Sequence, residues 1–276
     1  MLSLLWQRIE QRLDCNRPQW RNDIDRFGQA SAVEKREGGS CWSDNEVFEG
    51  LVRSVLSANT DWAKVELVLP ELCTLMHGFS LSWYAALSPM DVKRTLVPWF
   101  KQRRANSQSL DKNLQRLIES ATQLSGISQR HGSLENYLAH LAKQRNGDPK
   151  AVAAALGEIG SLAKLPGLGI ALAAEFLKNI GYDVAKPDRH INRAVGSFGL
   201  IQFTMWPDQR GFETPQARKP ELRTVMQVME TWALQLGFRV TFLDNAVWLL
   251  CAKCGLHLSN SDLVALRAQV VPNGHA

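Results

Sequence analysis

Apolar residues recur along most of the chain at intervals of three and four, which is the spacing of one face of an amphipathic helix. The clearest example covers residues 45–57, where Phe48, Leu51 and Val55 fall on a single face. Ser43 and Glu46 have the spacing of a capping box, in which each side chain binds the backbone N–H of the other residue. Strand-like alternation is scarce throughout, so the pattern predicts an all-α protein.

Turn-forming residues divide the rest of the pattern into further helices. Asp148 followed by Pro149 has the form of a helix start and predicts a helix that reaches about residue 159. Residues 170–180 and 222–254 show the same helical spacing, whereas Pro and charged residues at 204–221 predict a loop. Residues 1–27 have a helical period rather than that of a signal peptide, and no apolar run could span a bilayer. We therefore expect an intracellular, cytoplasmic protein.

A glycine-rich turn lies between two of the expected helices. It consists of Leu165, Pro166, Gly167, Leu168 and Gly169. Glycines without a Cβ allow positive φ and close approach, Pro166 fixes φ, and the two leucines can anchor the turn in the core. The helix after it begins with N–H groups that lack an intrahelical partner, and such groups favour an anion such as phosphate. Lys164 and Lys178 could add positive charge. A plain link between packed helices would use the same residues, and both interpretations stay open here.

A second informative segment follows Gly181, which is expected to end the helix. Asp188 is a preferred N-cap, and Ile191, Val195 and Phe198 then follow at helical spacing, so a new helix is predicted to start there. A carboxylate at a helix start is stabilised in its ionised form, which would suit a role beside developing positive charge. Asp188 could also be only a cap, and the two roles are compatible.

Three basic or titratable side chains follow Asp188 within the next five positions. Arg189 and Arg193 are four residues apart on one helix face, where they could bind phosphate or remain solvated. His190 is interpreted as structural.

Taken together, these segments resemble the helix-hairpin-helix DNA glycosylase superfamily, whose best-known branch contains endonuclease III. The resemblance lies in the turn at 165–169, the alanine-rich helix after it, and Pro187-Asp188-Arg189-His190 with Arg193. Residues 48–61, which include Leu56-Ser57-Ala58-Asn59, are similar to an early helix of that family. The match covers roughly residues 44–200. It implies a two-lobed helical fold with a cleft between the lobes.

The resemblance also implies lobe boundaries and residue roles. One lobe would span residues 44–162, and the other would combine 1–43 with 163–276 and contain the helix-hairpin-helix, at about 152–181, and the catalytic aspartate. Asp188 matches the family's invariant aspartate. Ala171 matches the position where bifunctional members carry a lysine, so a monofunctional glycosylase without lyase activity is expected, with water as the nucleophile. Asn59 matches a glutamine that fills the gap left in the duplex, although an ordinary helix end is an alternative.

The implied partner is double-stranded DNA that contains a damaged base, bound by a monomer through residues 165–169, Asn59, Arg189 and Arg193. A net charge of +5 and a pI near 9.0 agree with a polyanionic partner without requiring one. The densest basic run comprises Lys101, Arg103, Arg104, Lys112 and Arg116, and a solvated helix face is the favoured interpretation of it.

Cysteine usage argues against a metal cofactor. Cys251 and Cys254 have metal-ligand spacing, but a second pair is missing and so is the four-cysteine iron–sulfur loop of endonuclease III. We expect no metal and no cofactor, with Cys251 and Cys254 packed on the last long helix.

The sequence is least informative about the substrate. Nine tryptophans are present; Trp62, Trp83 and Trp99 fall in the first expected lobe, and Trp42 lies directly before it. Electron-rich aromatic faces attract cations, so an alkylated purine is the first expectation, ahead of oxidised or mismatched bases, although each single Trp is better explained as a core residue. Two other classes stay open: a non-catalytic helix-hairpin-helix DNA-binding protein, and a structural helical protein with a chance motif.

Overall fold

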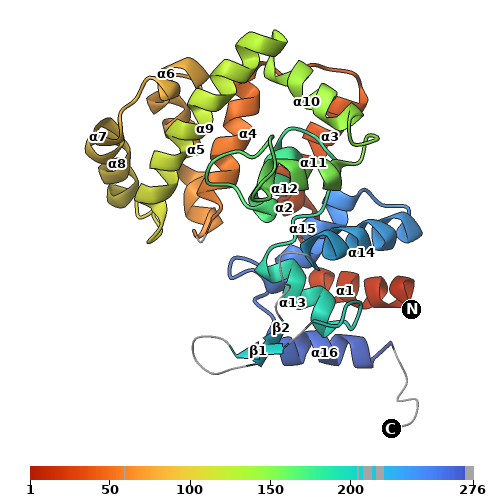
Figure 1. Cartoon of the computed structure of the whole chain (residues 1–276). Helices are drawn as coiled ribbons and strands as arrows, with labels where there is room; N and C mark the ends of the chain where they lie inside the picture. The colour runs from red at the N-terminus through yellow and green to blue at the C-terminus, as the bar shows by residue number, and fades with distance from the viewer. Residues whose placement is uncertain (59, 204, 208–212, 216–220, 271–276) are drawn as a thin grey trace. The chain divides into compact units, whose positions relative to one another are not determined.

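A computed structural model describes residues 1–58, 60–203, 205–207, 213–215 and 221–270 (Figure 1). The described part is helical except for one small antiparallel sheet, in which β1 (Met205–Pro207) pairs with β2 (Glu213–Pro215). The all-α prediction is therefore confirmed. The expected loop at 204–221 contains this short hairpin instead. The chain folds into two compact units: unit 1 is Met1–Ser31 with Asp183–Ala276, and unit 2 is Ala32–Tyr182.

Unit 2 contains the helices from the end of α3 to α12. They are α3 (Gln29–Glu37, which crosses the division), α4 (Asp44–Leu56), α5 (Trp62–Leu75), α6 (Leu81–Ala85), α7 (Pro89–Asp91), η1 (Val92–Leu96), α8 (Val97–Gln102), α9 (Leu110–His131), α10 (Leu134–Lys143), α11 (Pro149–Gly157) and α12 (Ile170–Asn179). The long helix α9 packs against α4, α6 and α10, and α12 packs against α4 and α11. The predicted helices at 45–57, 149–159 and 170–180 are confirmed to within about two residues at each end.

The predicted capping box at the start of α4 is present. The Ser43 hydroxyl accepts a hydrogen bond from the Glu46 N–H at 3.3 Å, and the Glu46 carboxylate accepts from the Ser43 N–H at 2.8 Å. Lys35 also donates to Glu46, at 2.6 Å, and this bond is the main reason why the pKa of Glu46 falls to about 2. The start of α4 is therefore fixed by both a cap and an ion pair.

The connection between α11 and α12 is held by close packing within unit 2. A Cβ added at Gly157, the last residue of α11, would lie 2.5 Å from the backbone nitrogen of Ile170, the first residue of α12. Ser54 on α4 donates to the Leu172 carbonyl at 2.6 Å. Helices α4, α11 and α12 thus hold both ends of the glycine-rich turn.

Unit 1 contains the two ends of the chain. Its elements are α1 (Leu2–Asn16), α2 (Trp20–Arg26), α13 (Arg189–Ser197), the β1–β2 hairpin, α14 (Glu221–Leu236), α15 (Val240–Cys251) and α16 (Asn260–Ala268). Its core is rich in aromatic rings: Trp6 contacts Trp20 and Phe238 edge to face, with ring centroids 6.1 and 5.1 Å apart. Helix α15 packs against α2, α13 and α14, and so lies near the centre of this unit.

The C-terminal region differs from the sequence prediction. The helix expected at 222–254 is broken, because Gly237 adopts a left-handed conformation (φ 69°) between α14 and α15. Cys251 is buried at the end of α15, and burial raises the pKa of its thiol to about 11. Cys254 lies beyond that helix end, so its predicted place on the helix was wrong. Helix α16 was not predicted.

The unit boundaries also differ from the expected lobes. Residues 32–43 and 163–182 group with unit 2, because α12 packs on α4 and α11. The glycine-rich turn consequently belongs to unit 2, whereas Asp188 belongs to unit 1. None of the described helices is long and apolar enough to cross a bilayer.

Candidate functional site

The glycine-rich turn has the exposure pattern predicted from its sequence. Leu165 and Leu168 are buried, and Gly167 and Gly169 are exposed. Gly167 has a φ of 77°, and a Cβ at this position would lie 3.1 Å from the Cβ of Arg116 on α9. Both the backbone conformation and the close approach of α9 therefore favour glycine here.

Side chains hold the carbonyl groups of this turn. The Ser120 hydroxyl donates to the Pro166 carbonyl at 2.8 Å. The Lys164 ammonium donates to the Leu165 carbonyl at 2.9 Å and also to the Leu168 carbonyl. The sequence suggested Lys164 only as an added positive charge, and it gave no sign of Ser120, because no local pattern links α9 to the turn.

The N–H groups of the turn point the other way. Every peptide bond of the described chain is trans, so the Gly167 N–H is antiparallel to the Pro166 carbonyl and the Gly169 N–H is antiparallel to the Leu168 carbonyl. Neither N–H finds a hydrogen-bond acceptor among the described residues. No side chain caps α12, which begins immediately after Gly169. The turn thus presents backbone donors on its exposed glycines, which is the geometry that suits an anion.

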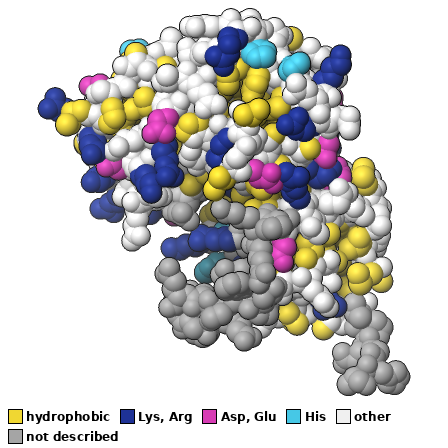
Figure 2. All heavy atoms as spheres, viewed as in Figure 1, with side chains coloured by type: hydrophobic (Ala, Val, Ile, Leu, Met, Phe, Trp, Pro, Cys, Tyr) yellow, Lys and Arg dark blue, Asp and Glu magenta, His cyan; other side chains and the backbone are white. Residues whose placement is uncertain are grey.

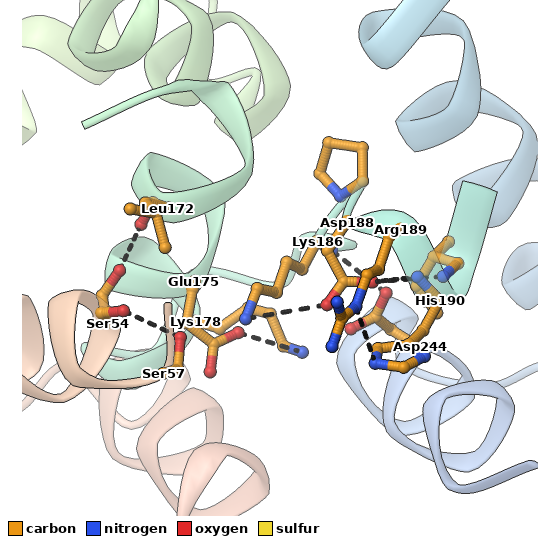
Figure 3. A network of polar contacts seen from close by, with 12 residues as sticks. Ser54, Ser57, Leu172, Glu175, Lys178, Lys186, Asp188, Arg189, His190 and Asp244 are labelled. Atoms are coloured by element: carbon orange, nitrogen blue, oxygen red, sulfur yellow. Dashed lines mark hydrogen bonds and ion pairs between the residues drawn. The ribbon is translucent and has the colours of Figure 1, made fainter. Parts of the chain in front are cut away.

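Asp188 is the N-cap of α13, as predicted. Its Oδ1 accepts hydrogen bonds from the N–H groups of His190 and Ile191, at 2.8 and 3.2 Å. The side chain retains 17% of its exposure, and its Oδ2 lies 3.8 Å from the Lys186 Nζ (Figure 3). One carboxylate oxygen therefore holds the helix, while the other is available for a second role.

The segment before Asp188 is fastened to α15 within unit 1. Asp183 accepts hydrogen bonds from the N–H groups of Val240 and Thr241, at 3.0 and 2.7 Å. Buried Asp244 on α15 accepts from the Lys186 N–H at 3.0 Å. These contacts position the loop that carries Asp188. No sequence pattern indicated them, because the partners are separated by 57 or 58 positions along the chain.

The side chains around Asp188 have different environments. Burial lowers the pKa of His190 to about 4, so its ring is neutral at pH 7, and it lies 6.1 Å from the Trp248 ring. This agrees with a structural histidine. Arg189 is exposed, whereas Arg193 donates to the Cys251 carbonyl at 3.1 Å. The two arginines expected on one face therefore do not share one environment.

A separate group of polar residues in Figure 3 belongs to unit 2. Lys178, which was expected to add charge for a phosphate, retains only 2% of its side-chain exposure and lies 3.8 Å from Glu175. Its side chain, which belongs to α12, is buried rather than displayed on the surface. Lys178 was expected to add positive charge at the turn, and its ammonium is instead buried beside Glu175.

The remaining expected site features are only partly described. Asn59 lies outside the described residues. Lys35 lies 4.1 Å from the ring centroid of Trp42, and Arg103 lies 4.3 Å from that of Trp99. Cationic side chains of the protein itself therefore already contact two of the four tryptophans.

Basic residues do not form one uniform patch on the face seen in Figure 2, where acidic side chains are interspersed among them. Arg103, from the densest basic run, is itself paired with Glu71 at 2.7 Å. In the described part of the chain, no group of three or more His, Cys, Asp or Glu side chains could hold a metal ion.

Comparison with known proteins identifies the fold. No protein-family model and no curated protein matches the sequence. Among solved structures, the Methanocaldococcus jannaschii 8-oxoguanine glycosylase/lyase, in complex with 15mer DNA containing 8-oxoguanine, aligns with a TM-score of 0.58 and 16% identity over 94% of this chain and 100% of that one. The 8-oxoguanine DNA glycosylase of Thermotoga maritima aligns with a TM-score of 0.56 and 19% identity over 91% and 97%. The chain therefore has the helical DNA glycosylase fold that its motifs resemble.

Proposed function

We propose that this protein is a DNA glycosylase of base excision repair that hydrolyses the N-glycosidic bond of a flipped, damaged base. The observation that carries the proposal is Asp188, a partly exposed carboxylate whose Oδ1 caps α13 and whose Oδ2 accepts no hydrogen bond from the backbone of the described residues. The outward N–H groups of the turn at 165–169 and the shared fold support it. The protein would act as a monomer on double-stranded DNA, in the cytoplasm where chromosomal DNA is accessible.

The reaction requires what these residues offer. A base in a duplex must rotate out before a side chain can reach its glycosidic bond, at a cost of about a few kcal/mol. Bond cleavage then builds positive charge on the sugar, and a fixed carboxylate stabilises that charge. We assign this role to Asp188, and we assign the gripping of the DNA backbone to the amides of Gly167 and Gly169, with exposed Arg189 as a further phosphate contact.

Water is the proposed nucleophile. Ala171 occupies the position at which bifunctional members of the resembled family carry a lysine, and a methyl group cannot form a Schiff base with the sugar. The proposed enzyme is therefore monofunctional and leaves an intact abasic site.

A damaged purine is the proposed substrate class. Both solved neighbours are 8-oxoguanine glycosylases, so an oxidised purine is the first candidate to test. The alkylated purine expected from the tryptophans comes second, because Lys35 and Arg103 already lie over two of those rings.

The test is release of a damaged base by the purified protein. Duplexes that each carry one lesion, including 8-oxoguanine and 3-methyladenine, would be incubated with the protein and then treated with alkali, which cleaves at abasic sites. Alkali-dependent cleavage of one of them supports the proposal. Tight duplex binding with no cleavage across the panel would favour the alternative, a non-catalytic helix-hairpin-helix DNA-binding protein.

A further inference from the structure

The glycine-rich turn is organised from inside by side chains, and their arrangement has a consequence for DNA binding. Three of its carbonyls, those of Leu165, Pro166 and Leu168, accept hydrogen bonds from Lys164 or Ser120. Gln123 on α9 adds a hydrogen bond to the Lys164 carbonyl at 3.1 Å. The carbonyls of Leu165, Pro166 and Leu168 are thus held by side chains from inside.

Fixing a carbonyl also fixes the N–H of the same peptide plane. Ser120 holds the plane that contains the Gly167 N–H, and Lys164 holds the plane that contains the Gly169 N–H. A glycine-rich turn has unusual backbone freedom, so without these bonds both planes could rotate and turn their N–H groups away. Ser120 is fully buried, at 0% exposure, and it cannot touch a ligand bound to the outer face.

We propose that Lys164 and Ser120 are positioning residues for phosphate binding: they hold the carbonyls of the turn inward so that the Gly167 and Gly169 N–H groups face a DNA phosphate. Lys164 would act as a built-in cation bound to backbone oxygens rather than as a direct phosphate ligand. This inference rests on the proposed function only in so far as the ligand is duplex DNA. It does not depend on which lesion is removed.

The two residues differ in charge, which makes the proposal testable. Ser120→Ala removes no charge and alters no exposed atom, yet it frees one peptide plane. Lys164→Met removes the ammonium but keeps most of the side-chain volume. Each variant loses the hydrogen bond that holds one glycine N–H plane, and this loss should weaken binding of a plain duplex by about 5-fold. Lys143→Met, which removes an exposed lysine from α10, is the charge-matched control, with an expected change of less than about 2-fold.

Salt dependence separates positioning from direct contact. A lysine that neutralises a phosphate contributes about 0.9 to the slope of log affinity against log salt. We expect Lys164→Met to keep the wild-type slope while its affinity falls. A slope reduced by about one, together with wild-type affinity of Ser120→Ala, would show a direct phosphate contact and overturn the proposal.

The experiment measures duplex affinity by fluorescence anisotropy at several salt concentrations, with thermal melting of every variant. If Lys164→Met does not fold, Ser120→Ala carries the test. Unchanged affinity of the folded variants refutes the inference, even if base release proves the proposed function. Weakened affinity without any base release supports the inference and refutes the glycosylase. A wild-type protein that binds no duplex refutes both.

Discussion

Substitution of Asp188 by asparagine separates the charge of this side chain from its structural role. Oδ1 of Asp188 accepts hydrogen bonds from two N–H groups at the start of α13, at 2.8 and 3.2 Å. Asparagine retains an acceptor oxygen at this position, and the two residue types are about equally good N-caps. Asp188→Asn therefore removes the negative charge and keeps the start of the helix.

The expected effects on stability and on rate differ widely in size. The 3.8 Å ion pair between Lys186 and Asp188 is lost, and the two side chains retain 12% and 17% of their exposure. Such a long pair contributes up to about 1 kcal/mol, equivalent to at most about 4 °C in melting temperature for a chain of this size. Loss of a group that stabilises transition-state charge lowers a rate by about 100- to 1,000-fold.

The assay is single-turnover base release with enzyme in excess, combined with the affinity for the same duplex and thermal melting. Asp188→Asn should bind DNA at least as tightly as wild type, because it removes a negative charge, and it should lose the chemical step. Asp183→Asn is the matched control: it alters a carboxylate in the same loop that caps α15 instead. Its rate should change little, although its stability should fall.

Base release by Asp188→Asn within about threefold of wild type would refute the assignment. Parallel loss of rate and DNA affinity would indicate a structural role.

Three further predictions concern other parts of the molecule. Gly157→Ala places a methyl group 2.5 Å from the Ile170 nitrogen, so it should lower the free energy of unfolding, measured in denaturant, by about 1–3 kcal/mol. DNA binding should weaken as α12 shifts. Unchanged stability would contradict the packing argument. Burial lowers the pKa of His190 from 6.5 to about 4, so stability present above pH 6.5 is lost as pH falls towards 4. As the pH is lowered over this range, the melting temperature of His190→Gln should fall less than that of the wild type. Parallel pH profiles of the two proteins would contradict this role of His190. Borohydride should trap no covalent complex between the wild-type protein and DNA. If a complex were trapped and disappeared in Lys186→Met, the nucleophile would be an amine, and hydrolysis by water alone would be refuted.

The features that the sequence predicted correctly depend on neighbouring residues. The Asp188 cap, the box of Ser43 and Glu46, and the helix start at Asp148-Pro149 each form between residues within three positions of one another, so a short pattern contains all the necessary information. The same holds for the buried leucines and exposed glycines of the turn.

The features that were missed depend on packing. Gly237 is compatible with a helix interior, at some cost, and only the surrounding fold decides that the chain breaks there. The sequence suggests Lys164 as an added positive charge for phosphate, yet its ammonium turns back onto carbonyls of its own turn. Asp244 and Lys186 meet only because α15 packs beside α13. Such contacts join distant parts of the chain and have no local signature.

Electrostatics explain why backbone groups take part both in the proposed phosphate binding and in holding Asp188. A protein that binds a polyanion and also needs a fixed anion faces repulsion between the two. In the proposed function, the Gly167 and Gly169 amides are uncharged phosphate ligands, so they would attract DNA without pairing with the carboxylate, and Arg189 is the charged contact. Asp188 is held by helix N–H groups through Oδ1 and lies 3.8 Å from Lys186 through Oδ2, so its charge is partly offset before DNA binds. In the proposed reaction, Oδ2 is the oxygen that would stabilise the positive charge as it develops on the sugar.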